Sequence, residues 1–235
     1  MLFITSISPK HILEGRQAEC VETILQKGEL HSLNHPDEIE LLKPLYPKVK
    51  FVPTYSTQKY LREKYKPYVR VNALFNHHLN IGYTGDICII NSDIEIGDKF
   101  DIGKLSAHTA KGMVYLHRHD YDNDKSKAQR YTMGIDAMCV HTELIDCLPQ
   151  TMHCLGQTYW DIVFPYFFWM QGVKLFTVKE PYIYHKKHHM QYSTNDWEYW
   201  GRHTAQVVGG QRANFKPSEL SNWLYKLLEE ATQTI

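Results

Sequence analysis

A short buried strand that runs directly into an acidic turn constrains the fold of this chain most strongly. Residues 87–90 are continuously apolar and rich in β-branched side chains, and Gly85 precedes them. This pattern predicts a central strand of a sheet that is covered on both faces. The strand is followed by Asn91-Ser92-Asp93, at the position where open α/β sheets bind their ligands. The same three residues are equally compatible with a simple polar turn, and the motif alone does not decide between the two interpretations.

Strand-like and helix-like segments alternate along much of the chain. Strands are predicted from β-branched or continuously apolar runs, and helices from apolar residues at helical spacing. The predicted strands are residues 2–7, 30–33, 49–52, 87–90, 113–116, 134–140 and 174–178, the last continued by 181–185. The predicted helices are residues 17–26, 36–46, 69–79, 142–148, 159–171 and 218–231, the last capped by Ser218. This order predicts one α/β domain, residues 1–235, with a Rossmann-like, mostly parallel central sheet flanked by helices.

The bulk composition argues against some classes of function. The chain has 26 basic and 26 acidic residues, so no strong general attraction to nucleic acid or to an anionic membrane is expected. A local basic patch is still compatible with this balance. The five cysteines form no CxxC pair, which favours reduced, buried thiols. No apolar run approaches the roughly 20 residues of a membrane helix, so we expect no transmembrane segment and a soluble, cytoplasmic protein.

Two further segments carry side chains that are able to do chemistry. Asp161 lies at the start of a very apolar helix, directly after the aromatic pair Tyr159-Trp160, and His185 follows an apolar strand. Each has a structural explanation, because the helix dipole favours an N-terminal acid and a lone histidine is usually structural. The functional alternatives are a general base at Asp161, flat aromatic faces for a sugar or base beside it, and a metal or phosphate ligand at His185. Lys186 would help to neutralise a diphosphate.

Asp120, Asp122 and Asp124 have the spacing of the first half of an EF-hand calcium loop. That loop requires glycine at its sixth position and glutamate at its twelfth, which here are Lys125 and Tyr131. An EF-hand is therefore rejected, and a solvated polar loop is predicted instead.

Six short pieces of the chain occur in an order that is more informative than any one of them. They are Ile4-Thr5-Ser6-Ile7, Ser32-Leu33-Asn34 followed by Glu38-Ile39, Ile89-Ile90-Asn91-Ser92-Asp93-Ile94, Gly134-Ile135-Asp136-Ala137, Trp160-Asp161 and Pro181-Tyr182-Ile183-Tyr184-His185. This ordered set, spanning roughly residues 2–189, resembles the nucleotide-sugar glycosyltransferases of the GT-A fold. It is most similar to small bacterial and viral members with an Asn-Ser-Asp version of the Asp-X-Asp motif.

The resemblance implies a donor site, a metal site and an acceptor site. A UDP- or GDP-sugar would be bound by Thr5, Ser6, Asn91, Ser92 and Lys186. Asp93 and His185 would hold Mn²⁺ or Mg²⁺, with the neutral Asn91 in the place of the usual first acid. The acceptor hydroxyl would be activated by Asp161, and the acceptor would be bound by Tyr159, Trp160 and Asp136. Residues 1–110 would form the nucleotide-sugar-binding half of the domain, and residues 111–235 the acceptor-binding half.

The expected function is the metal-assisted transfer of a hexosyl or pentosyl unit from a nucleotide-sugar to an acceptor hydroxyl. The acceptor is left open among a glycan, a lipid-linked sugar and a modified DNA base. Because Asn91 replaces an acid, a sugar-nucleotide-binding protein without turnover is the alternative. A nucleotidyltransferase is disfavoured, since no Gly-rich phosphate loop followed by lysine occurs near the N-terminus. The region containing Trp197, Trp200, Arg202 and Arg212 is predicted to form the acceptor surface.

Overall fold

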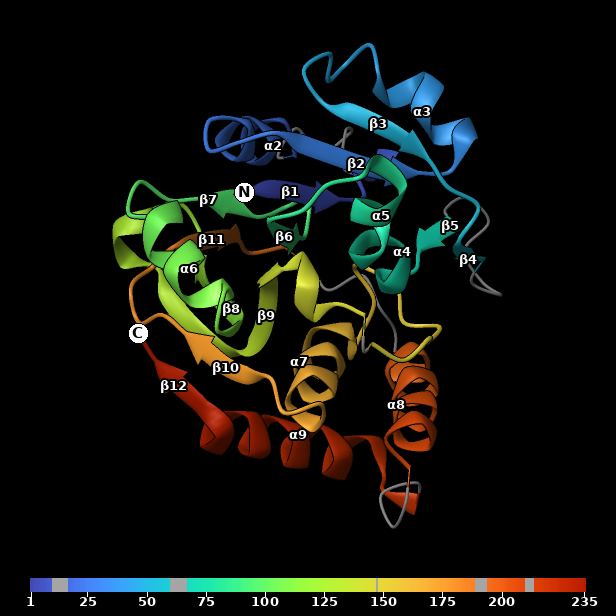
Figure 1. Ribbon diagram of the computed structural model, residues 1–235, viewed down its shortest axis with the longest axis vertical. Helices are drawn as coiled ribbons and strands as arrows, with labels where there is room; N and C mark the ends of the chain where they lie inside the picture. The colour runs from blue at the N-terminus through green and yellow to red at the C-terminus, as the bar shows by residue number, and fades with distance from the viewer. Residues whose placement is uncertain (10–16, 60–66, 147, 189–193, 210–213) are drawn as a thin grey trace.

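Ten of the twelve strands in the described part of the chain belong to one sheet (Figure 1). The structure is a computed structural model that describes residues 1–9, 17–59, 67–146, 148–188, 194–209 and 214–235. The sheet contains β1 (Leu2–Thr5), β2 (Leu30–Asn34), β3 (Lys50–Pro53), β6 (Asp86–Ile90), β7 (Glu95–Ile96), β8 (Gly112–Tyr121), β9 (Gln129–His141), β10 (Lys174–Thr177), β11 (Ile183–Lys186) and β12 (Thr232–Thr234). A separate two-stranded sheet pairs β4 (Thr57–Lys59) with β5 (Pro67–Val69).

The large sheet consists of two parallel blocks joined by one antiparallel strand. Its order is β12-β10-β8-β9-β6-β1-β2-β3, with β11 paired to β7 and β8. The pairs β12-β10, β10-β8, β6-β1, β1-β2 and β2-β3 are parallel. β9 is antiparallel to both of its neighbours, β8 and β6. The predicted mostly parallel sheet is therefore confirmed. Residues 1–110 and 111–235 both contribute strands to it and are joined by the β6-β9 and β7-β11 pairs.

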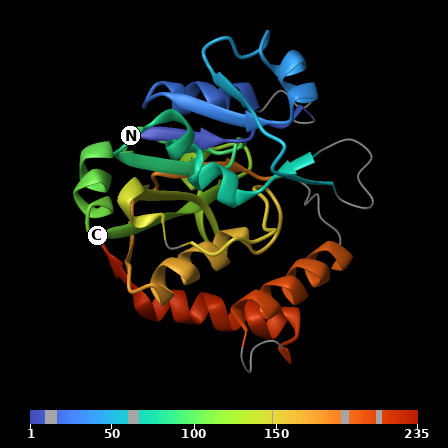
Figure 2. The ribbon, with the colours of Figure 1, turned by 45° about the vertical axis from the view of Figure 1, so that its right-hand side comes forward.

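Helices cover both faces of this sheet. The core on one face includes residues from α2 (Gln17–Leu25), α3 (Pro36–Leu42) and α6 (Ile102–Thr109). The core on the other face includes residues from α4 (Val71–Phe75), α7 (Trp160–Met170), α8 (Thr194–Val208) and α9 (Pro217–Ala231), and α5 (His77–Ile81) follows α4 directly. Two short 3₁₀ turns are η1 (Lys125–Lys127) and η2 (Thr142–Leu144). In Figure 2 the orange-to-red C-terminal helices α8 and α9 lie together beneath the sheet.

The two faces of β6 show why the sequence folds in this way. Successive side chains of a strand point to opposite faces of a sheet. Ile87 and Ile89 accordingly belong to the core that contains α7 and α9, whereas Cys88 and Ile90 belong to the core that contains α2 and α6. All four are completely buried, so the central strand predicted from the apolar run 87–90 is confirmed.

Several element boundaries differ from the sequence-based expectation. The helix predicted over residues 69–79 is two short helices that meet at Asn76. The final helix begins at Pro217, and Glu219 accepts a hydrogen bond of 2.9 Å from the Lys216 backbone N–H, so the prediction of a Ser218 cap was wrong. β11 does continue the line of β10, because both pair in parallel with successive parts of β8.

Two expectations from composition can be compared with the structure. Cys20, Cys88, Cys139 and Cys154 are buried, while Cys147 lies outside the described residues. Within the described residues, every helix is too short or too polar to cross a membrane.

Candidate functional site

A cavity of about 330 Å³ lies at the carboxyl ends of β1, β6 and β11, against residues of α7, α8 and α9. Its volume is at the small end of the range typical of ligand pockets, roughly 300–1,000 Å³. The structure brings together in its lining most of the residues predicted from sequence, namely Ser6, Asn91, Ser92, Asp93, Asp136, Tyr159, Trp160, Asp161 and His185. Ser6, residues 91–93 and His185 come together because the carboxyl ends of parallel strands meet at one edge of a sheet, whereas β9 supplies Asp136 and the start of α7 supplies residues 159–161.

Two predicted donor-binding residues, Thr5 and Lys186, do not line this cavity. Thr5 pairs with Ser32 of β2, and its side chain is completely buried. Lys186 follows His185 on β11, and neighbouring side chains of a strand point to opposite faces. His185 is therefore buried at the cavity while Lys186 is exposed to solvent. The structure gives no support for a donor-binding role of either Thr5 or Lys186.

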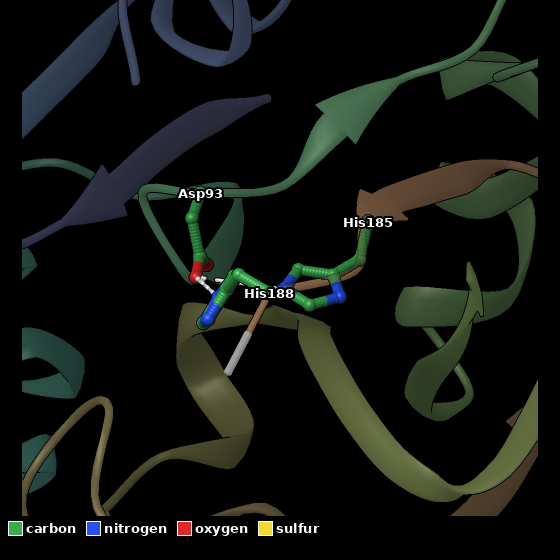
Figure 3. A group of neighbouring side chains, drawn as sticks. All are labelled: Asp93, His185 and His188. Atoms are coloured by element: carbon green, nitrogen blue, oxygen red, sulfur yellow. Dashed lines mark ion pairs between the residues drawn. The ribbon is translucent and has the colours of Figure 1, made fainter. Parts of the chain in front are cut away.

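Three side chains that can ligate a metal converge at the strand ends (Figure 3). The Asp93 Oδ2 atom lies 3.8 Å from Nε2 of His185 and 3.5 Å from Nε2 of His188. One ligand atom from each of the three residues lies within 4.8 Å of the other two. A carboxylate and two imidazoles at this spacing could hold a divalent cation. His188 was not among the predicted ligands, although its position three residues after His185 is a usable signal.

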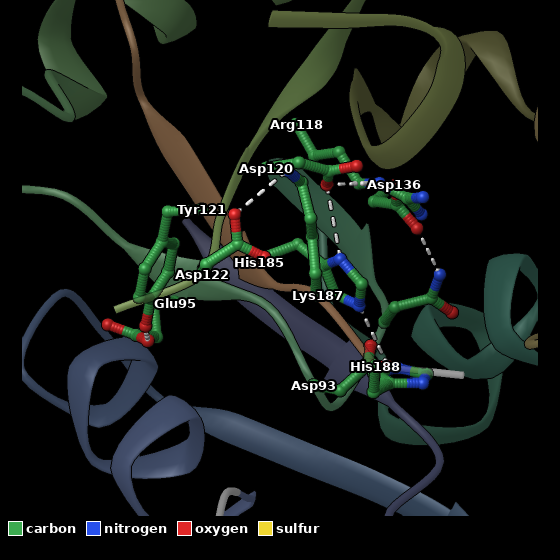
Figure 4. A network of polar contacts seen from close by, with 11 residues as sticks. Asp93, Glu95, Arg118, Asp120, Tyr121, Asp122, Asp136, His185, Lys187 and His188 are labelled. Atoms are coloured by element: carbon green, nitrogen blue, oxygen red, sulfur yellow. Dashed lines mark hydrogen bonds and ion pairs between the residues drawn. The ribbon is translucent and has the colours of Figure 1, made fainter. Parts of the chain in front are cut away.

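A hydrogen bond orients the His185 ring toward Asp93 (Figure 4). The Nδ1 atom of His185 lies 3.1 Å from Oδ1 of Asp120, which leaves Nε2 to face Asp93. A carboxylate behind an imidazole is the usual arrangement at metal-binding histidines. Burial raises the pKa of Asp120. Its hydrogen bond to His185 and the nearby charge of Arg118 together lower the pKa by more than burial raises it, so the net pKa is below the usual range. The Asp120 carboxylate therefore accepts from an Nδ1–H of His185.

The prediction of a solvated loop at Asp120, Asp122 and Asp124 was wrong for Asp120. Asp120 lies within β8 and is only partly exposed, whereas Asp122 and Asp124 are exposed as predicted. The even spacing of the three acids gave no sign that Asp120 differs from the other two, because the sequence pattern does not show that β8 ends at Tyr121.

A second set of hydrogen bonds ties the Asn-Ser-Asp turn to β8 and β9. Arg118 donates to Asp120 at 2.8 Å and to Asp136 at 3.1 Å (Figure 4). The side-chain amide of Asn91 donates to the other carboxylate oxygen of Asp136, and the Asn91 backbone N–H donates to the Asp136 carbonyl at 3.0 Å. Both carboxylate oxygens of Asp136 are thus occupied. Asn91 serves here as a hydrogen-bond donor, which an aspartate could not be while ionised.

An irregularity in the β8-β9 pairing places two side chains in the cavity lining. His117 pairs with Ile135, but His119, only two residues later, pairs with Arg130, and the register shifts between them. The extra residues of β9 lie opposite Arg118, and among them Tyr131 and Met133 line the cavity. Such irregularities re-aim side chains next to functional sites. Sequence reasoning missed both residues, because a shift in register follows from pairing and not from local pattern.

Asp161 lies in the first turn of α7, on the cavity wall. Its Oδ2 atom accepts a hydrogen bond of 3.3 Å from the hydroxyl of Tyr225, a residue of α9. Burial, and then the negative charge of Asp136, raise the pKa of Asp161 to about 7. Hydrogen bonds from the backbone N–H groups of Ile135 and Asp161, and the positive charge of Arg118, oppose this rise, so burial and like charge are the larger effects. A carboxyl group with this pKa can exchange a proton near neutral pH.

The aromatic residues next to Asp161 pack inside the cavity wall and expose almost none of their own surface. Tyr159 and Trp160 are only 3% and 2% exposed. Tyr159 adopts a left-handed backbone conformation, with φ of 73°, which is unusual for a large residue. Its hydroxyl donates to the Pro217 carbonyl at 2.8 Å, and its ring lies 5.7 Å from that of Trp197. Strained backbone of this kind is concentrated at functional sites.

Of the residues after 189 that were predicted to form the acceptor surface, only some of the described ones line the cavity. Trp197 lines it, but Trp200 is buried in the core, and Arg202 is exposed and paired with Glu198 at 3.2 Å. Arg212 lies outside the described residues. Tyr225 is a further lining residue that the sequence did not reveal, since the pattern of α9 shows which face is apolar but not what that face meets.

The charge of the described lining is strongly negative. It contains the four aspartates Asp93, Asp136, Asp161 and Asp196, whereas Arg118 is the one lysine or arginine among the described lining residues. Two nearly buried hydroxyls, those of Ser6 and Thr158, also line the cavity and have no hydrogen-bond partner within the described residues. Buried hydroxyls normally have partners, so these two are unsatisfied polar groups in the cavity wall.

Comparison with known proteins identifies the fold. No protein-family model matches the chain, and no curated protein matches its sequence. Among solved structures, S. aureus TarS 1–349 is similar with a TM-score of 0.54 and 11% identity, over 95% of this chain and 68% of that one. A second TarS structure gives 0.53 and 10%, over 98% and 43%. TarS 1–349 in complex with UDP-GlcNAc gives 0.54 and 11%, over 97% and 70%. At these identities the similarity shows the fold alone, and the predicted GT-A-like α/β fold is confirmed.

Proposed function

We propose that this protein is a metal-assisted glycosyltransferase that uses a nucleotide-sugar donor. The observation that carries the proposal is the pairing, in one cavity, of the Asp93-His185-His188 group with Asp161, whose pKa is about 7. The first can hold a cation beside a diphosphate, and the second can take a proton from an acceptor hydroxyl. The GT-A-like fold supports the proposal, since one TarS structure with this fold holds UDP-GlcNAc. We propose a UDP- or GDP-sugar as the donor, with a hexosyl or pentosyl unit as the group transferred.

The donor atoms at the strand ends fit a divalent cation. Asp93 supplies an oxygen and His185 and His188 supply nitrogens, while Asp120 orients the first imidazole. Mn²⁺ accepts such a mixed set, whereas Mg²⁺ prefers oxygen ligands alone, so we expect Mn²⁺ to bind more tightly than Mg²⁺. A bound cation would supply the positive charge that the lining of the cavity lacks when a diphosphate enters it.

Polar groups of the chain itself would hold the donor. Ser6, Ser92 and Thr158 line the cavity and would offer their hydroxyl groups to the donor. Ser92 shares a hydrogen bond of 2.7 Å with the Gln17 amide, which fixes the position of its hydroxyl. We assign Asn91 a positioning role, because its amide is committed to Asp136.

Asp161 would act on the acceptor. In an inverting displacement its carboxylate takes the proton of the acceptor hydroxyl as that oxygen bonds to the anomeric carbon. The bond between the anomeric carbon and the diphosphate oxygen breaks, and the nucleoside diphosphate leaves with the electron pair. The Tyr225 hydroxyl lies 3.3 Å from Asp161 Oδ2 and also contacts the Met133 carbonyl, so it would stand beside the carboxylate at this step.

Calorimetric titration tests the donor assignment. UDP, GDP and a panel of their sugars are titrated into the protein with Mn²⁺ and again with EDTA. We expect one nucleotide to bind at least about tenfold more tightly with Mn²⁺, because the cation offsets charge in an acidic cavity. Absence of binding across the panel, by protein shown to be folded, would overturn the proposal.

A further inference from the structure

Two partly exposed aromatic side chains, Tyr131 and Trp197, line the same cavity as Asp161. Tyr131 and Met133, from the irregular part of β9, are 41% and 47% exposed although both line the cavity. Trp197 of α8 lines the same cavity and is partly exposed. Exposed aromatic residues that border a pocket offer flat apolar faces to a ligand.

The two aromatic rings are held in place by their own contacts. The Arg118 guanidinium lies 4.6 Å from the centre of the Tyr131 ring. Trp197 packs against Tyr159, with ring centres 5.7 Å apart and planes inclined by 35°. Gly134 permits the approach on the β9 side, because a Cβ at that position would lie 2.7 Å from the Tyr131 ring. Rings fixed before binding lose little conformational entropy when a ligand packs on them.

The charge of the cavity lining selects against anionic ligands. Asp136, Asp161 and Asp196 line the cavity together with the aromatic residues. The cation that faces them, Arg118, already donates to Asp120 and Asp136, and no lysine lies in the described lining. A chain of phosphodiesters would bring negative charge against these carboxylates, and without the metal no uncommitted lysine or arginine of the described lining would offset it.

We propose that the acceptor is an uncharged saccharide whose ring packs on Tyr131 and Trp197 and presents a hydroxyl to Asp161. This inference rests on the proposed function, because it names the acceptor of that reaction. A sugar ring has an apolar face of C–H groups that suits an aromatic surface, and hydroxyls that suit carboxylates. It therefore matches both features of the cavity, whereas a DNA acceptor matches only the aromatic rings.

The test is saturation-transfer NMR on the protein without donor or metal. The probes are methyl glycosides of neutral hexoses, pentoses and 2-acetamido sugars, and a DNA duplex that contains 5-hydroxymethylcytosine. We expect ring protons of at least one neutral sugar to receive saturation, with an affinity that is unchanged between 50 and 300 mM salt. The same sugar presented as a glycolipid in neutral micelles then distinguishes a free glycan from a lipid-linked acceptor.

Variants locate the binding surface. Tyr131→Ala and Trp197→Ala should each weaken sugar binding by about tenfold, while Tyr131→Phe should keep it, since the ring and not the hydroxyl carries the contact. Tyr199→Ala is the matched control, because Tyr199 is an exposed aromatic residue of α8 outside the cavity lining. Gly134→Ala gives a second perturbation, which displaces the Tyr131 ring without removing it.

Three outcomes would overturn the inference. They are saturation of the DNA and of no sugar, no signal from any sugar, and sugar binding that Tyr131→Ala and Trp197→Ala leave unchanged. The donor titration is run on the same preparations. Loss of metal-dependent donor binding with sugar binding intact would contradict the proposed function, whereas the reverse result would contradict the acceptor assignment alone.

Discussion

Asp93 and Asp161 carry the same chemical group into one cavity but lie in different surroundings. Asp93 follows a strand and faces two imidazoles, one of which is oriented by Asp120. Asp161 begins a helix, lies against aromatic residues and feels the charge of Asp136, so its pKa is raised to about 7. A carboxylate among ligating nitrogens is suited to binding a cation, and a carboxyl group with a neutral pKa is suited to moving a proton. The surroundings, and not the residue type, divide the two roles.

The largest expected effect is on the rate of transfer when Asp161 is replaced. Asp161→Asn should lower the rate of transfer by about 10²–10⁴-fold, because the amide cannot take the acceptor proton. Donor affinity should remain within about twofold, since Asp161 does not belong to the metal-ligating group. Steady-state kinetics and donor calorimetry on one preparation measure both. Transfer at the wild-type rate would show that Asp161 is not the base.

The complementary effect is expected at Asp93. Asp93→Ala should remove the Mn²⁺-dependent part of donor binding, a loss of about 10–100-fold in affinity. Asp98→Ala is the matched control, because Asp98 is exposed and outside the cavity lining. A metal response that survives Asp93→Ala would place the cation elsewhere.

The pH dependence of transfer sharpens the comparison further. Asp161 acts in its ionised form, so the rate should rise with pH and level off above a midpoint near the pKa of about 7. Asp136→Asn removes the like charge that raises this pKa and should move the midpoint to lower pH. A pH-rate profile of both proteins is the measurement, and identical midpoints would argue against coupling between the two carboxyl groups.

Asn91→Asp tests the connection between the two regions. If Asn91 were a weakened metal ligand, an acid there would strengthen metal binding. We predict the opposite result, because Asn91 donates to Asp136 and an ionised carboxylate in its place would repel that residue. Denaturant unfolding should show a loss of about 1–3 kcal/mol at pH 8 and a smaller loss at pH 5, where the pair can share a proton. Tighter Mn²⁺ binding without loss of stability would contradict this interpretation.

The last expected effect is on the pH dependence of stability. Because the folded-state pKa of Asp161 is about 7 and the usual value is 3.8, the folded protein holds this proton more tightly than the unfolded chain does. The contribution of the Asp161 carboxyl group to the free energy of unfolding is fully present below pH 4 and is lost as the pH rises toward 7. Asp161→Asn removes this loss, so the variant should be more stable than the wild type by about 3 kcal/mol more at pH 8 than at pH 5, since about 1.4 kcal/mol is lost for each of the two pH units between 5 and 7. Thermal unfolding at the two pH values checks this, and an equal effect at both would contradict a raised pKa.

Strand ends were the part of the site that could be predicted from sequence. The run before Asn91 indicated a central strand, and parallel strands end at one edge, so Asp93 and His185 come together as expected. Residues placed by pairing between strands or packing between helices gave no local signal. Tyr131 depends on the register shift opposite Arg118, and Tyr225 depends on how α9 meets α7. Neighbouring side chains of a strand point to opposite faces, so Lys186 points away from the cavity that His185 lines. The prediction of a donor-binding role for Lys186 did not take this alternation into account.

The division of roles between the two carboxylates is tested most directly by measuring donor affinity and nucleoside diphosphate release side by side in Asp93→Ala and Asp161→Asn. We predict opposite patterns: Asp93→Ala loses metal-dependent donor binding, whereas Asp161→Asn binds the donor normally and releases the diphosphate slowly. Loss of binding in both variants, or unchanged release in both, would contradict the assignment of one carboxylate to the cation and the other to the proton.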